Sequence, residues 1–173
     1  MATAVKNNHD LILTRILDAP RENVWKAWTD PEEVKKWWGP KDFTAPHISI
    51  DLRVGGKFVY CMSGAGLDGV VKDYWNTGEH LAIVPMEKIV TTMSFADEQG
   101  NPVPASHYGL PGDWPSETLV TAAFEDIEGG KTKVTVREVG IPDVMIKSAG
   151  LGWDQSFDKL ADALTKARVL QAA

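Results

Sequence analysis

Residues 143–169 read DVMIKSAGLGWDQSFDKLADALTKARV. Apolar residues recur here at steps of three and four, the spacing of one face of an α-helix. They are Ile146, Ala149, Trp153, Phe157, Leu160, Leu164 and Ala167. The spacing predicts a long amphipathic helix, which needs an apolar surface to cover. Gly150 and Gly152 each cost up to about 1 kcal/mol against alanine inside a helix, so we expect them to mark a place where space is needed.

The strands that precede this helix are expected to supply that surface. Apolar and polar residues alternate with a period of two in short segments separated by turn residues. We expect strands at 11–17, 47–54, 57–62, 70–84, 88–95, 118–124 and 132–138. The fourth is long enough to predict a bulge near Gly78. Two short helices are expected after the first strand, starting at Pro20 and at Asp30-Pro31.

This order of elements is typical of an α+β fold, in which an antiparallel sheet buries one face on a helix. A sheet that curves around one helix leaves a gap where its curvature exceeds the reach of the side chains. We therefore expect a cavity opposite Gly150–Trp153, where the predicted helix is thinnest.

Composition and charge narrow the class of protein. The chain has 173 residues, 43% of them hydrophobic, which fits a single domain over residues 1–173 with an ordered core at about 9–169. Its 18 basic and 24 acidic residues give a net charge of −6, which argues against a nucleic-acid partner or an anionic membrane surface. No apolar run spans a bilayer and Met1–Asp10 does not resemble a signal peptide, so we expect a cytoplasmic protein.

Several motifs along the chain resemble the SRPBCC superfamily, in the branch of the C-terminal domain of the activator of the ninety-kilodalton heat-shock chaperone ATPase. The motifs are APRENVWKAWTDPE at 19–32, WWGP at 37–40, DLRVGG at 51–56, IVP at 83–85, KIV at 88–90, ETLVT at 117–121 and GWDQSF at 152–157. Each is weak alone, but together they cover nearly the whole chain in the right order.

The resemblance implies a helix-grip (START-like) fold. In that fold a curved antiparallel sheet of about six to seven strands surrounds a long C-terminal helix, and two short helices follow the first strand. It also implies a hydrophobic ligand cavity and, through the chaperone activator, a chaperone partner and a role in the stress response.

Large apolar side chains are expected on the face of the sheet that meets the C-terminal helix and on the face of the helix that meets the sheet. The predicted ligand-binding residues are Tyr60, Met62, Trp75, Met93, Phe124, Trp153 and Phe157. The Tyr60 hydroxyl and the ring N–H groups of Trp75 and Trp153 would orient a ligand in such a pocket. The simpler alternative is that these residues form a plain core. Tyr108 and Trp114 lie in the proline-rich segment 97–115 and are expected to form a lid.

Glu138 is the ionisable residue that the pattern singles out. It continues the face of Thr132, Val134 and Val136, so a carboxyl group inside a cavity, with a raised pKa, is one interpretation. We favour the simpler one, in which Glu138 reaches water or pairs with Arg137 or Lys133.

No other chemistry is indicated. The four histidines are scattered and form no metal motif with the single Cys61. No nucleophile elbow, phosphate-binding loop or dinucleotide motif occurs, so no cofactor is expected.

The sequence therefore predicts a protein that binds a small hydrophobic molecule between sheet and helix, without an identifiable catalytic apparatus. Two alternatives stay open. A chaperone-binding module would have an exposed apolar patch and a solid core. A cyclase- or aromatase-like enzyme would need acid–base groups that converge in the cavity, such as Glu138 with Tyr60 or His80. A homodimer is compatible with the sequence, which does not specify one.

Overall fold

The computed structural model describes residues 8–173. Its seven strands form one antiparallel sheet in the order β1-β7-β6-β5-β4-β3-β2. The strands are β1 (Asn8–Leu17), β2 (Thr44–Ile50), β3 (Lys57–Ala65), β4 (Val71–Val84), β5 (Lys88–Ala96), β6 (Thr118–Ile127) and β7 (Lys131–Pro142). The antiparallel order and the long final helix confirm the predicted α+β, helix-grip arrangement.

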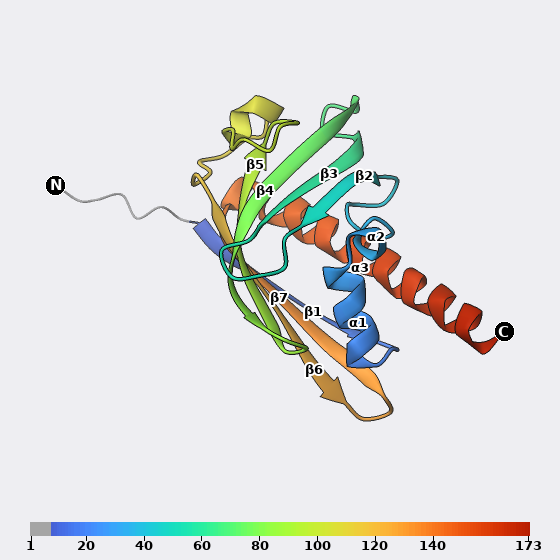
Figure 1. The fold of residues 1–173 in the computed structure, drawn as a ribbon. Helices are drawn as coiled ribbons and strands as arrows, with labels where there is room; N and C mark the ends of the chain where they lie inside the picture. Colours follow the sequence, from blue (N-terminus) through green and yellow to red (C-terminus); the bar gives the residue numbers. More distant parts are fainter. Residues whose placement is uncertain (1–7) are drawn as a thin grey trace.

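The helices lie against one face of this sheet (Figure 1). They are α1 (Arg21–Thr29), α2 (Pro31–Val34) and α3 (Asp143–Ala172), and the 3-10 helix η1 (Ala105–Tyr108) lies apart from them. α3 crosses the sheet diagonally over β1 and β7, and α1 and α2 lie beside its C-terminal half. η1 belongs to the long segment between β5 and β6, at the end of the molecule away from the C-terminus.

The solid part of the core lies between α1, the middle of α3 and strands β6 and β7. Fully buried side chains there include Val24, Phe124, Val134, Phe157 and Leu160. A second cluster under α2 includes Val34, Ile48, Phe58 and Tyr60, and Trp38 and Met93 pack against both clusters. The first turns of α3 lie outside this packed region, although Met145 in the first turn is buried.

The first short helix begins at Arg21, with Pro20 in the extended N-cap position before it. Local signals at the second helix act as the sequence predicts. The Asp30 side chain accepts a hydrogen bond of 3.0 Å from the backbone N–H of Glu32, and Pro31 occupies the first helical position. Gly39 then reverses the chain with a φ of +102°, a conformation that favours glycine.

Two expectations about the strands need adjustment. The segment predicted as a strand over 47–54 ends at Ile50, and Leu52 and Val54 are 41% and 61% exposed in the following turn. The alternation of apolar and polar residues continues past the end of the strand. There the backbone groups of Asp51, Arg53 and Gly56 form hydrogen bonds within the turn, so the apolar positions of the pattern are not buried. The irregularity in β4 lies between His80 and Ala82, two residues beyond the position expected.

The two helix glycines do not mark a close approach of another element. A Cβ atom added at Gly150 would lie 3.5 Å from Leu11 Cδ1, and one at Gly152 would lie 3.6 Å from Pro40 Cγ. Both distances are ordinary van der Waals contacts, so no close approach of another element requires glycine at either position.

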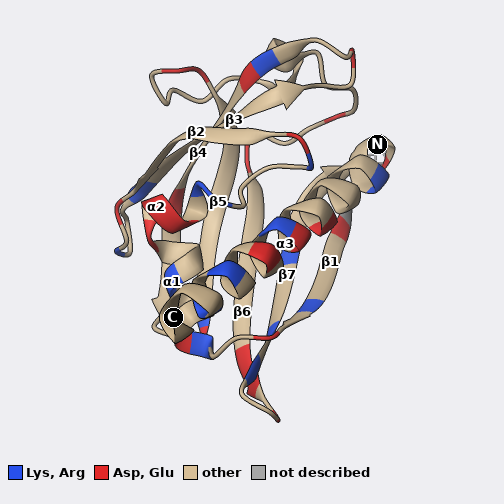
Figure 2. Ribbon diagram, turned by 90° about the vertical axis from the view of Figure 1, so that its right-hand side faces the viewer, with Lys and Arg blue, Asp and Glu red and all other residues tan. Residues whose placement is uncertain are grey.

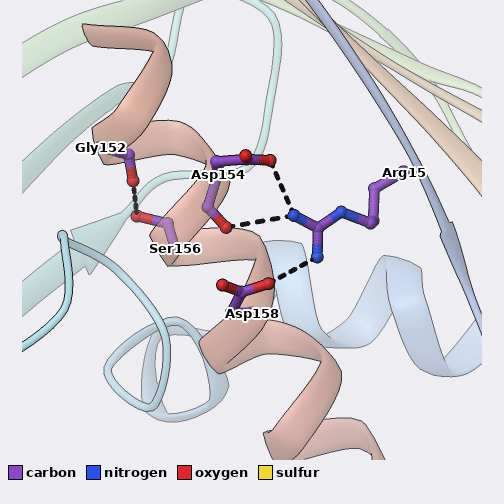
Figure 3. Close-up of polar contacts among 5 residues, drawn as sticks. All are labelled: Arg15, Gly152, Asp154, Ser156 and Asp158. Carbon is purple, nitrogen blue, oxygen red and sulfur yellow. Dashed lines mark hydrogen bonds and ion pairs between the residues drawn. The ribbon is translucent and has the colours of Figure 1, made fainter. Parts of the chain in front are cut away.

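Charged side chains fix α3 to the edge of the sheet. Arg15 on β1 donates hydrogen bonds of 2.7 Å to both Asp154 and Asp158, which lie one turn apart on α3 (Figure 3). Figure 2 shows that charged positions recur along the whole of α3. The Arg15 guanidinium also lies 5.6 Å from the centre of the Phe157 ring. Arg15 therefore contacts both the acidic side chains of α3 and an aromatic ring of the core.

Candidate functional site

A cavity of about 800 Å³, partly open to solvent, lies where the first turns of α3 separate from the sheet. Ala149, Gly152 and Trp153 line it from α3, opposite β3, β4 and β5. The loop at 39–43 and the segment between β5 and β6 complete the wall. The hollow predicted opposite Gly150–Trp153 is therefore present.

Six aromatic rings contribute to the wall of this large cavity. They belong to Trp38, Phe43, Tyr74, Phe95, Trp114 and Trp153. The Trp38 ring meets the Trp153 ring edge to face at 5.6 Å, and Phe95 meets Trp114 in the same way at 5.1 Å. These contacts hold the rings to one another, so much of the apolar wall is formed in advance of any ligand.

Glu138 is buried in this wall and is only 8% exposed. Its Oε1 accepts a hydrogen bond of 2.9 Å from the Thr118 hydroxyl, and its Oε2 accepts one of 3.0 Å from Trp153 Nε1. Burial raises the pKa of the Glu138 carboxyl, and the two hydrogen bonds oppose part of that rise. The arrangement places a buried carboxyl group on the wall of a mostly apolar cavity.

The favoured expectation for Glu138 is thus wrong. Arg137 pairs with Asp10 on β1, and Lys133 lies 3.6 Å from Glu125 on β6. Both basic residues point away from the helix-covered face because side chains alternate along β7. Glu138 has the same parity as the buried valines of that strand and therefore faces inward.

A lysine fixes the rim of the cavity. Lys159 Nζ on α3 lies 2.9–3.4 Å from the backbone carbonyl oxygens of Trp38, Gly39, Pro40 and Phe43. Partial burial among these carbonyls lowers the pKa of Lys159. Sequence reasoning missed this contact because no local signal joins residues more than a hundred positions apart.

Four predicted site residues line the large cavity. Met62, Met93 and Trp153 contribute from β3, β5 and α3, and the predicted lid residue Trp114 closes one side. Trp114 Nε1 donates a hydrogen bond of 3.0 Å to the carbonyl oxygen of Pro111, which holds the indole within its own loop.

The other predicted residues lie elsewhere. Phe124 and Phe157 are fully buried in the solid core, and Tyr60 is buried between Trp38 and Phe58. Tyr108 ties η1 to the sheet, because its hydroxyl donates to the Ala96 carbonyl and accepts from the Trp75 backbone N–H.

Trp75 does not line the large cavity, and its ring lies 5.5 Å from that of His47. The register pairs Met62 with Tyr74 and Tyr60 with Asn76, and paired residues share a face of the sheet. Tyr74 and Asn76 therefore contribute from β4 in place of Trp75. Sequence reasoning missed them, although their parity with respect to β3 was a usable signal.

A second, much smaller cavity of about 40 Å³ lies under α2. His80 and Tyr60 line it, together with Trp38, Met93 and Trp153, which also line the large cavity. His80 is 3% exposed, and burial lowers its pKa. Glu138 is on the wall of the other cavity, so the three groups named as acid–base candidates do not converge on one space.

No helix among residues 8–173 is long and apolar enough to cross a membrane. Over the same described residues, no group of three or more His, Cys, Asp or Glu side chains is arranged to hold a metal ion.

Comparison with known families assigns the fold more closely. The sequence model of the family described as "Activator of Hsp90 ATPase homolog 1-like protein" matches residues 18–165. The chain belongs to this family. The match covers every residue of the large cavity, from Trp38 to Ser156.

Solved structures of other proteins share the fold. Protein CV1439 from Chromobacterium violaceum is 30% identical, with a TM-score of 0.71 over 90% of this chain and 96% of that one. The AHSA1 protein SPO3351 from Silicibacter pomeroyi is 21% identical, with a TM-score of 0.69 over 92% and 99%. CalU16 from Micromonospora echinospora is 22% identical, with a TM-score of 0.61 over 95% and 83%. A search of curated proteins gave no match.

Proposed function

We propose that this protein binds a small, largely apolar molecule in the large cavity. The observation that carries the proposal is the cavity itself, about 800 Å³ with an aromatic wall. Ligand sites in proteins are typically about 300–1,000 Å³ and mostly apolar, with a few polar groups. Covering about 300 Å² of apolar ligand surface contributes about 7 kcal/mol before the costs of ordering are subtracted.

The cavity favours this function over a purely surface-acting module. The family description refers to an activator of a chaperone ATPase, and binding a chaperone would use the outside of the domain. That role needs no hollow between helix and sheet, and an empty apolar space costs stability because its lining loses contacts.

The distribution of ionisable groups also supports binding without chemistry. Glu138 lies on the wall of the large cavity, whereas His80 lies on that of the small one. An acid–base mechanism requires groups within hydrogen-bonding reach of one reacting molecule. Glu138 and His80, the two side chains most suited to acid–base catalysis, therefore line different cavities.

Titration with Nile red, an uncharged apolar dye that fluoresces when it leaves water, tests the proposal. The wild-type protein is expected to bind the dye at one site. Ala149→Trp fills the cavity from α3 and should weaken binding by about tenfold or more, which corresponds to about 1.4 kcal/mol. Lys166→Trp adds the same indole at an exposed position of the same helix and serves as the matched control.

Equal affinity in the wild type and both variants would place the dye outside the cavity. No binding to a folded wild-type protein would contradict the proposed function directly.

A further inference from the structure

Glu138 has no opposite charge beside it. Among residues 8–173, its hydrogen-bond partners are the Thr118 hydroxyl and the Trp153 ring N–H, both neutral. The other charged or titratable side chains on the described cavity wall are Tyr74 on β4 and Lys41, which is exposed at the rim. A buried carboxyl group is ordinarily paired with a cation or held neutral.

The hydrogen bonds around Glu138 suit a neutral carboxyl in the absence of ligand. The Thr118 hydroxyl lies 2.9 Å from Glu138 Oε1 and 3.4 Å from the Met93 carbonyl oxygen. A protonated Oε1 can donate to the Thr118 oxygen, while the Thr118 proton turns to Met93. Oε2 still accepts from Trp153, and each carboxyl oxygen has two lone pairs. An acceptor position on Oε2 is thus left for a donor in the cavity.

We propose that the ligand is an apolar amine, whose protonated amino group pairs with the Glu138 carboxylate while its hydrocarbon part lies against the aromatic wall. This inference rests on the proposed function, since it specifies the ligand of the same cavity. An ammonium group supplies the missing opposite charge, and a charge-assisted hydrogen bond is about twice as strong as a neutral one. The Trp153 ring lies beside the carboxyl and packs edge to face against the Trp38 ring, and the faces of such rings attract cations.

The same geometry disfavours the commonest apolar acids. An ionised fatty acid has no proton to donate to the acceptor position on Glu138 Oε2, and its carboxylate would meet a like charge if Glu138 ionised. An alcohol of the same length can donate a hydrogen bond to Oε2 but brings no charge. The expected order of affinity is therefore amine, then alcohol, then carboxylate.

Displacement of bound Nile red by decylamine, decanol and decanoate at pH 7 tests this order. Decylamine should bind about tenfold more tightly than decanol, which corresponds to about 1.4 kcal/mol, because a hydrogen bond between charged groups is stronger than one from a neutral donor. In Glu138→Gln, decylamine and decanol should become equal within about twofold, with both affinities referred to that variant's own affinity for the dye. Glu128→Gln removes an exposed acid in the β6–β7 turn and should keep the preference.

A measurement on the wild-type protein covers the case in which Glu138→Gln does not fold. Pairing a protonated Glu138 with decylammonium transfers the carboxyl proton to the buffer. Calorimetric titration of decylamine in two buffers of different ionisation enthalpy should show this release below the pKa of Glu138, and decanol should show none.

The outcomes separate the two proposals. Nile red binding without a preference for decylamine, or with a preference for decanoate, overturns the amine assignment and leaves the apolar cavity standing. Absence of Nile red binding overturns both.

Discussion

The burial and hydrogen bonding of Glu138 depend on residues that are distant in the sequence. Its strand parity places it on the buried face, but its partners Thr118 and Trp153 come from β6 and α3. The sequence can predict the first point, because alternation along β7 continues to Glu138. It cannot predict the second, because neither partner is near in sequence, and we therefore expected a solvent-exposed carboxyl.

The raised pKa of Glu138 predicts whether its contribution to the free energy of unfolding rises or falls with pH. The folded state retains the carboxyl proton to higher pH than the unfolded chain, whose pKa is close to the ordinary value of 4.5. The stabilising contribution is complete below that value and is lost as pH rises through the folded pKa. Urea unfolding of wild type and Glu138→Gln between pH 4 and 8 should therefore show the wild type losing stability relative to the variant as pH rises.

Glu128→Gln serves as the control for this titration, because that acid is exposed. Parallel pH profiles for the wild type and Glu138→Gln would show that burial of Glu138 does not alter its titration.

At the scale of elements, α3 illustrates what periodicity predicts and what it omits. The three- and four-residue steps locate the helix and the side that meets the sheet. They do not reveal that Lys159 on this helix binds the carbonyls of the loop at 39–43. In β4 the signal was ambiguous because Tyr74 and Trp75 are adjacent aromatics, and only the register with β3 shows which one faces the cavity.

The helix glycines give a prediction about stability. Gly150→Ala should raise the free energy of unfolding by about 0.5–1 kcal/mol, because alanine favours helix and the added methyl makes an ordinary contact with Leu11. Gly64→Ala in β3 is the contrasting variant, since its Cβ would lie 2.6 Å from the Phe43 ring. Urea unfolding should show stabilisation in the first variant and destabilisation in the second. A loss of stability in Gly150→Ala would mean that this position does require glycine.

Lys159 gives a prediction about the cavity rim. Lys159→Met keeps most of the unbranched side chain but removes the ammonium group and its hydrogen bonds to the loop, so amide exchange over residues 39–43 should become faster. Hydrogen–deuterium exchange measured by mass spectrometry reports this rate, with Lys166→Met as the control on the same helix. Unchanged exchange in Lys159→Met would show that the other loop contact, from the Lys41 N–H to Gln155 Oε1, is sufficient.

At the scale of the whole molecule, the fold places a packed core and a cavity side by side under one helix. The C-terminal half of α3 covers the core with α1, while its first turns face β3, β4 and β5 across the hollow. The order of elements and the family motifs predict this arrangement, because each element carries its own pattern. The dimensions of the cavity depend on sheet curvature and on the segment between β5 and β6, which carry no periodic signal.

The methionines provide the most direct test of ligand binding in the cavity. Met62, Met93 and Met145 line it, whereas Met86 lies in the turn between β4 and β5, away from the wall. With ¹³C-labelled methionine methyl groups, addition of Nile red should shift the signals of the three cavity residues and leave that of Met86 unchanged. A shift at Met86 alone, or no shift at the other three while the dye is bound, would contradict the proposal that this hollow is the binding site.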